Sequence, residues 1–123
     1  MSACRTEWYM DSILLVGGGG HCHSIIDIIE TAGIYSIAGI VDRPELVGTT
    51  VLGYPCIGCD DNLPKLMKEC SCAHITLGSK GDNALRADLF SRMKILGYRF
   101  PVLVSPTAHV SRHANLGDGT VVM

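Results

Sequence analysis

The sequence predicts an α/β protein with a small, open sheet of parallel strands, followed by the start of a repeat of short strands. Three observations carry this prediction. A strand, a glycine-rich turn, a helix and a second strand follow one another within about 30 residues. Strand-like and helix-like segments then alternate up to residue 104, and the last residues change to a period of six. We therefore divide the chain into an N-terminal extension (1–11), an α/β domain (12–105) and the beginning of the repeat (106–123).

The first unit of the α/β domain is a strand, a turn and a helix. Residues 12–16 form a short apolar run that ends at four glycines, which indicates a buried strand. In residues 21–31 isoleucines recur at helical spacing, and Gly33 follows at the position of a C-terminal cap. A second strand is expected over 36–41, ending at Asp42. This arrangement has the size of a βαβ unit, whose two strands pair in parallel.

The remaining segments continue the alternation. Pro55 limits the segment 53–58 to a short edge strand, because proline cannot donate to a strand ladder. The other expected elements are a helix over 63–69 capped by Asp60 or Asp61, a strand over 74–77, a helix that starts at Asp82 or Asn83 and ends at Gly97, and a strand over 100–104.

The C-terminal segment has a six-residue period. Its small residues are Ala108, Ala114 and Thr120, and its aliphatic residues are Val110, Leu116 and Val122. A coil of short parallel strands turns one face inward at every sixth residue, and such coils need about three or more repeats to bury a core. We interpret the segment as the first coil of a hexapeptide-repeat β-helix, cut short at Met123.

Composition narrows the classes of function. The 123 residues carry a net charge of −2, with 47% apolar and 18% charged residues, which excludes a disordered chain. No basic stripe is present to neutralise a phosphate backbone, so nucleic acid is not expected as a partner. The apolar runs are far shorter than the roughly 18 residues of a membrane span, and the N-terminus does not resemble a secretory signal. We expect a cytoplasmic protein with no membrane contact.

The six cysteines are expected to be thiols in a reducing cytosol, where a free cysteine behaves as a small buried hydrophobe. A zinc site is the other reading of the cysteine and histidine pattern. It would draw on His21-Cys22-His23, Cys56-x-x-Cys59 and Cys70-x-Cys72-x-His74. These groups lie on separate predicted elements and give no compact ligand spacing, so we do not expect a metal.

Four glycines, Gly17, Gly18, Gly19 and Gly20, lie between the first strand and the first helix, and His21 follows them. Backbone N–H groups at a helix N-terminus are unsatisfied, the helix dipole favours negative charge there, and glycines let a phosphate approach closely. The segment therefore predicts a site for a phosphate-bearing ligand. His21 can donate a hydrogen bond or act as an acid or base near neutral pH. A plain turn and a surface histidine are the alternatives.

The dinucleotide fingerprint G-x-G-x-x-G fits this segment only in part. Its first two glycines fall on Gly17 and Gly19, but Cys22 stands at the third position, where glycine permits close packing of the helix. No Gly-Lys-Ser/Thr follows, which excludes a P-loop. The segment is therefore a weak signature for a nicotinamide cofactor.

Further candidate ligand contacts follow two other strands. Asp42 can accept hydrogen bonds from ribose hydroxyls or a base N–H, and Arg43 beside it can contact a phosphate. Gly78, Ser79 and Lys80 end a neighbouring strand and are expected to line the same crevice. The alternatives are a turn cap for Asp42 and an ordinary loop before a helix for the residues from Gly78 to Lys80.

A family likeness is carried by segments 13–21 (ILLVGGGGH), 41–42 (VD), 53–58 (GYPCIG), 105–110 (SPTAHV) and 116–123 (LGDGTVVM). In this order they resemble bacterial sugar O- and N-acetyltransferases of the sialic-acid and bacillosamine-pathway type. The likeness covers nearly the whole chain after Met10.

The resemblance implies a Rossmann-like N-terminal domain that holds a nucleotide-linked or sialic-acid-type sugar, followed by a left-handed β-helix that forms a homotrimer. It implies that acetyl-CoA binds between neighbouring β-helices and that a histidine of the β-helix is the catalytic base. The residues from Gly17 to His21, with Asp42, would contact the sugar nucleotide. The chain stops at Met123, before that histidine, so we expect no catalytic residue in it and binding without turnover.

Two other functions stay open at this stage. One is an NAD(P)-binding oxidoreductase module, and the other is a non-catalytic ligand-sensing domain. The sequence does not distinguish UDP from CMP or a free sugar, or an amine acceptor from a hydroxyl, and it leaves the oligomeric state of this chain open.

Overall fold

The structure is a computed structural model, and it describes residues 11–17, 20–76, 83–106 and 121–122, with the side chains of 20, 21, 83, 121 and 122 excepted. The strands are β1 (Asp11–Val16), β2 (Tyr35–Val41), β3 (Thr50–Val51), β4 (Tyr54–Gly58), β5 (Ala73–Ile75), β6 (Leu103–Val104) and β7 (Val121–Val122). The α-helices are α1 (Gly20–Ala32), α2 (Leu63–Leu66) and α3 (Asn83–Leu96), and short 3-10 helices span Pro44–Leu46 and Asp60–Asn62.

The main sheet has the strand order β3-β4-β2-β1-β5, in which β4, β2, β1 and β5 run parallel. Only β3 runs antiparallel, as the outer strand of a hairpin with β4. The turn of this hairpin holds Leu52 at φ +50° and Gly53 at φ +89°. The predicted open parallel sheet is therefore confirmed.

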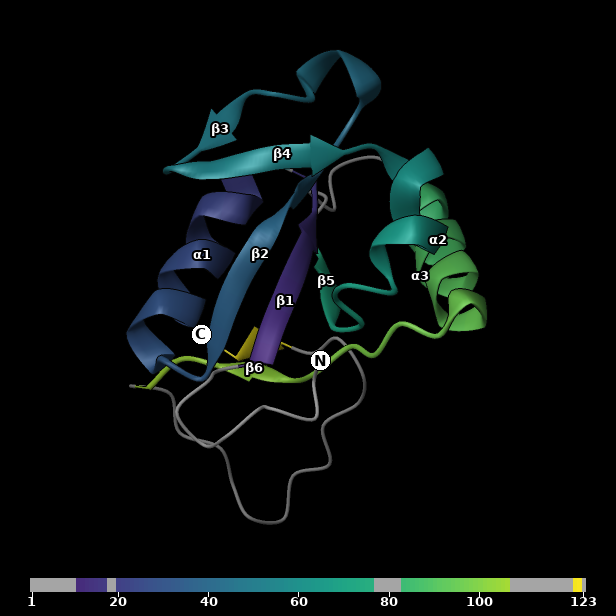
Figure 1. The fold of residues 1–123 in the computed structure, drawn as a ribbon. Coiled ribbons are helices and arrows are strands. Elements are labelled where there is room, and N and C mark those ends of the chain that lie inside the picture. The colour runs from purple at the N-terminus through teal and green to yellow at the C-terminus, as the bar shows by residue number, and fades with distance from the viewer. Residues whose placement is uncertain (1–10, 18–19, 77–82, 107–120, 123) are drawn as a thin grey trace.

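The side chains of the central strand β1 alternate between two cores. Ile13 and Leu15 are buried against the isoleucines of α1 on one face of the sheet. Leu14 and Val16 are buried on the other face in a cluster with residues of α2 and α3. Figure 1 shows the resulting three layers, with α1 on one side of the sheet and α2 and α3 on the other. Burial of β1 on both faces explains its continuous apolar run.

The boundaries of the first unit agree with the sequence pattern to within one residue. Gly33 ends α1 in the left-handed region (φ +69°), and its N–H donates to the carbonyl of Ile29 at 3.1 Å. Gly97 ends α3 in the same way (φ +106°). Both glycine caps are confirmed.

The prediction of an edge strand over 53–58 is wrong. Strand β4 lies between β2 and β3, so Pro55 is inside the sheet. Neighbouring residues of a strand bond to opposite sides, so Cys56 bonds toward β3 and the missing N–H of Pro55 faces β2, where the pairing begins only at Cys56. The Cys56 N–H donates to Thr49 and the Cys56 carbonyl accepts from Gly48. A two-residue strand, β3, forms the edge instead.

The prediction of a strand over 100–104 in the main sheet is also wrong. Only Leu103 and Val104 form a strand, and β6 pairs in parallel with β7 in a separate two-stranded sheet. Pro101 removes a donor in the middle of the segment. Phe100 packs on Phe90 of α3, with 4.7 Å between ring centroids. The six-residue repeat otherwise lies outside the described residues.

The cap predicted for the helix near residue 63 is wrong as well. Asp60 and Asp61 belong to a 3-10 turn, and the side-chain oxygen of Asn62 accepts the N–H of Cys59 at 2.9 Å. Helix α2 follows directly and is one turn long. No helix in the described parts of the chain is long and apolar enough to cross a membrane.

Tyr98 joins the end of α3 to α2, and it gives a prediction for alkaline pH. Its buried hydroxyl donates to the carbonyl of Leu63 at 2.6 Å, and burial, with a smaller contribution from Cys70, raises the pKa of Tyr98 to about 12. An unfolded tyrosine titrates near pKa 10, so the unfolded chain releases its proton first as the pH rises. The stabilisation is complete below about pH 10 and is lost as the pH rises to about 12.

We expect Tyr98→Phe to lower the free energy of unfolding by about 1 kcal/mol at neutral pH. Above about pH 10, the free energy of unfolding of the variant should fall less steeply than that of the parent chain. Urea denaturation across this window measures both effects. Equal slopes for the two proteins would contradict the assignment.

Candidate functional site

The parallel strands end at one edge of the sheet. In the ladders, Val16 pairs with both Val41 and Ile75, and Val41 pairs with Gly58. The residues that follow these strand ends, among them Gly17, Asp42 and Thr76, therefore lie at the same edge. In an open α/β sheet this carboxyl edge is where ligands bind.

Gly17 directly follows β1 and still bonds to the neighbouring strand β2. It is buried, its φ is +110°, and its N–H donates to the carbonyl of Val41 at 2.7 Å. A side chain is disfavoured in this conformation, which explains glycine at this position. Gly18 and Gly19, which the sequence places in the bend, lie outside the described residues.

Helix α1 begins at Gly20 and runs for 13 residues, with no acidic residue in its first turn. Its first N–H groups therefore have no carboxylate from that turn to satisfy them. His21 is part of this turn, and the structure describes its backbone only. The helix N-terminus lies where the sequence predicts a site for an anion.

Asp42 extends the edge from β2. Its N–H donates to the carbonyl of Gly58 at 3.1 Å, and its Oδ1 accepts the N–H of Arg43 at 2.8 Å. The turn-cap role that the sequence leaves open is therefore present. Burial is the main cause that raises the pKa of the Cys22 thiol in the first turn of α1, and the Asp42 carboxylate adds to this effect. The carboxylate is thus both a cap and part of the edge.

Arg43 is less closely held than Asp42. Its guanidinium forms an ion pair with Glu45 at 3.8 Å, and both side chains are largely exposed. Exposed pairs of this kind contribute little to stability, so the side chain can reorient toward a phosphate at low cost. Gly78, Ser79 and Lys80, which the sequence assigns to the same crevice, lie outside the described residues.

Sequence reasoning missed Thr76, which follows β5. It is 1% exposed, and its hydroxyl donates to the carbonyl of Val16 at 2.9 Å and to that of Gly17. A polar residue directly after a buried strand is a signal that could have identified it, because a buried hydroxyl needs a partner.

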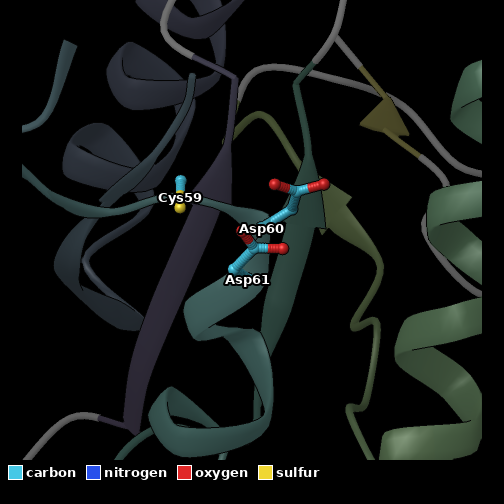
Figure 2. Close-up of side chains that lie close together, drawn as sticks. All are labelled: Cys59, Asp60 and Asp61. Atoms are coloured by element: carbon cyan, nitrogen blue, oxygen red, sulfur yellow. The ribbon is translucent and has the colours of Figure 1, made fainter. Parts of the chain in front are cut away.

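The three groups of cysteines and histidines that would form the hypothetical zinc site are not brought together as ligands in the described residues. Of the cysteines described, Cys22, Cys56, Cys70 and Cys72 are buried and all are free thiols. The one group at ligand spacing there is Cys59, Asp60 and Asp61, whose candidate atoms lie within 4.8 Å of one another (Figure 2).

This group has structural partners of its own. Cys59 Sγ hydrogen-bonds to the side chain of Asn62, and Asp60 pairs with Arg92 of α3 at 3.8 Å. Both contacts tie the segment after β4 to its neighbours. The group therefore carries no metal assignment.

The described residues line a polar cavity of about 330 Å³ at the other end of the parallel strands, where they begin. It lies beside the start of β1 and the segment before β5, with Asp11, Lys68, Ser71 and Arg99 among its lining residues. A much smaller apolar groove of about 20 Å³ lies between α1 and β6. Neither opens at the carboxyl edge described above.

Comparisons with known proteins place this geometry in context. A family model described as the PglD N-terminal domain matches residues 12–93. No curated protein sequence matches the chain significantly.

Among the solved structures that are at least 30% identical to this chain, two come from different organisms. One is a variant of perosamine N-acetyltransferase from Caulobacter crescentus in complex with CoA and GDP-perosamine (32% identity, TM-score 0.82, covering 94% of this chain and 52% of that chain). The other is the acetyltransferase domain of PglB from Neisseria gonorrhoeae in complex with acetyl coenzyme A (30% identity, TM-score 0.77, covering 94% and 54%). The chain thus spans about half the length of these relatives.

A more distant structure shares the fold alone. UDP-D-quinovosamine 4-dehydrogenase from Vibrio fischeri is 13% identical with a TM-score of 0.65, and the match covers 76% of this chain and 80% of that chain. At this identity the similarity supports the Rossmann-like fold and says nothing about oxidoreductase activity.

Proposed function

We propose, because this chain belongs to the PglD N-terminal domain family, that it is the substrate-binding part of an acetyl-CoA-dependent sugar acetyltransferase. The proposed substrate is a nucleotide-linked amino sugar or a sialic-acid-type sugar. The observation that carries the proposal is the match over 94% of the chain, at 32% identity, to an enzyme whose structure contains CoA and GDP-perosamine.

The geometry of the carboxyl edge supports binding of a nucleotide sugar. The N-terminus of α1 offers backbone N–H groups and a positive dipole to a diphosphate. Asp42 offers an acceptor for ribose hydroxyls or a base N–H, and Arg43 offers a cation nearby. We include Gly18, Gly19, His21 and the residues from Gly78 to Lys80 in the proposed site on their sequence positions.

Acetyl-CoA is the proposed acyl donor, and it supplies an activated thioester. Transfer to a sugar amine or hydroxyl needs a base that takes the proton of the acceptor. A polar cavity and a small apolar groove that described residues line both lie away from the carboxyl ends of the strands. We assign binding and orientation of the sugar nucleotide to this chain.

The domain division is part of the proposal. Residues 12–105 form the sugar-nucleotide domain, and residues 106–123 begin a β-helix. The parallel pairing of β6 with β7 is compatible with that beginning. We propose a homotrimer with a cytoplasmic location for the whole enzyme.

The test is calorimetric titration of the chain with GDP-mannose, UDP-N-acetylglucosamine and CMP-sialic acid. We expect saturable binding of at least one of them. Asp42→Asn should raise its Kd about tenfold, because it removes the charge that strengthens a hydrogen bond to the sugar nucleotide. Asp27→Asn, on the exposed face of α1, is the matched control and should leave the Kd unchanged.

Three results would count against the proposal. The first is failure of all three nucleotide sugars to bind. The second is an equal loss of affinity in the Asp42 and Asp27 variants. The third is tighter binding of NAD(H) than of any nucleotide sugar, which would favour the oxidoreductase reading.

A further inference from the structure

The ion pair between Arg43 and Glu45 lies at the carboxyl edge of the sheet. Asp42 is still on the ladder, because its N–H donates to the carbonyl of Gly58, and Arg43 directly follows it. Asp42 Oδ1 accepts the N–H of Arg43 at 2.8 Å, and the Arg43 carbonyl accepts the N–H of Leu46 at 2.9 Å. These hydrogen bonds fix the backbone of the segment and hold both members of the ion pair at this edge.

The pair changes the charge of the edge more than it changes the stability of the fold. Pro44 separates the two residues and begins the short 3-10 helix Pro44–Leu46, with Glu45 in its first turn. The guanidinium Nη1 and the carboxylate Oε2 are 3.8 Å apart, and the two side chains are 70% and 66% exposed. An exposed pair of this kind contributes little to stability. The carboxylate nevertheless cancels the positive charge that Arg43 would otherwise offer to a phosphate.

The charge of this edge affects which nucleotides bind there. A nucleotide sugar and a free nucleoside triphosphate share the base and the ribose, but the sugar-linked diphosphate carries about two negative charges and the triphosphate carries about four at neutral pH. The Coulomb energy between the ligand and a fixed charge is proportional to the charge of the ligand. A positive edge therefore favours the triphosphate, and a carboxylate that cancels this charge reduces that preference. Specificity is a difference of affinities, which a repulsive charge can supply.

We propose that Glu45 is a specificity-determining residue, which cancels the charge of Arg43 and so favours a nucleotide sugar over the free nucleoside triphosphate of the same base. This inference rests on the proposed function for its ligand. The hydrogen-bonded segment keeps Glu45 close to Arg43, and the weakness of an exposed pair leaves Arg43 able to turn toward a diphosphate. Glu45 thus lowers the affinity for every phosphate-bearing ligand, and it does so most for the most highly charged one.

The test is calorimetric titration of Glu45→Gln, which keeps the size of the side chain and removes its charge. The probes are the nucleotide sugar that binds the parent chain, among the three titrated above, and the triphosphate of the same base (GTP, UTP or CTP), in metal-free buffer at low salt. We expect the Kd to fall about threefold for the nucleotide sugar and about tenfold for the triphosphate. Arg43→Gln should raise both Kd values, again more for the triphosphate. High salt should reduce all of these changes, because it screens exposed charges.

Glu69→Gln is the matched control, because it changes the net charge equally at the other end of the parallel strands, and it should leave both Kd values unchanged. The role of Glu45 would be overturned by an equal effect of Glu69→Gln, by the same factor for both ligands, or by weaker binding in Glu45→Gln. A triphosphate that binds neither the parent chain nor Glu45→Gln would overturn it as well. Failure of every nucleotide sugar to bind would overturn the proposed function together with this role, whereas binding that Glu45→Gln leaves unchanged would overturn this role alone.

Discussion

Replacing Gly17 with alanine is expected to lower the free energy of unfolding by about 2 kcal/mol and to weaken binding of the nucleotide sugar more than tenfold. Gly17 has φ +110° and is buried at the end of β1. A Cβ in this region of φ costs about 1–2 kcal/mol, and the backbone must shift to relieve it. That shift displaces the N–H bonded to Val41 and the carbonyl bonded to Thr76, and with them the start of the bend that we propose receives the phosphates.

Gly48→Ala is the matched control for Gly17→Ala. Gly48 has a similar φ of +97°, but it is exposed, and an added Cβ there would meet nothing within 4 Å. It should therefore show a stability loss of about 1 kcal/mol from strain, with no change in affinity. Urea denaturation and calorimetry of both variants separate the two effects. Unaltered affinity in Gly17→Ala would remove the bend from the proposed site.

The sequence predicts the parts of the fold that local patterns determine. Three patterns predict these parts, and each involves only residues close together in the sequence. They are the apolar run of β1, the isoleucine spacing of α1 and the glycine at the end of α3. These patterns arise from burial of one strand or one helix face, so they can be recognised without knowing which elements pack against that strand or helix. The corresponding elements are confirmed.

The elements predicted wrongly depend on partners far away in the sequence. Pro55 is tolerated inside the sheet because Cys56 bonds toward β3 and the pairing of β4 with β2 begins only at Cys56, which the rule for proline in strands does not anticipate. The pairing of β6 with β7 joins residues 103–104 to 121–122, a partner that periodicity alone cannot select. In each case the local signal is present, but the identity of the neighbouring strand decides the outcome.

The candidate site likewise has a part that the sequence predicts and a part that it does not predict. Gly17 and Asp42 could be predicted at one edge, because parallel strands bring their carboxyl ends together. The contacts of Thr76 could not, because its hydroxyl bonds to the carbonyls of Val16 and Gly17, which lie far earlier in the sequence.

Truncation of Leu15 to alanine should cost the largest part of the stability among single core changes, about 3 kcal/mol out of the roughly 5–15 kcal/mol expected for a domain. Leu15 is fully buried in the central strand, with Ile40 and His74 as its neighbours in the ladders, and it packs in the cluster formed with α1. A cavity there loosens the contact between the sheet and the helix whose N-terminus forms the proposed site. Ile95→Ala, at a position 86% exposed on α3, should change the free energy of unfolding by less than about 0.5 kcal/mol. Urea denaturation measures both values, and equal losses would mean that the packing of α1 on β1 does not hold the domain together.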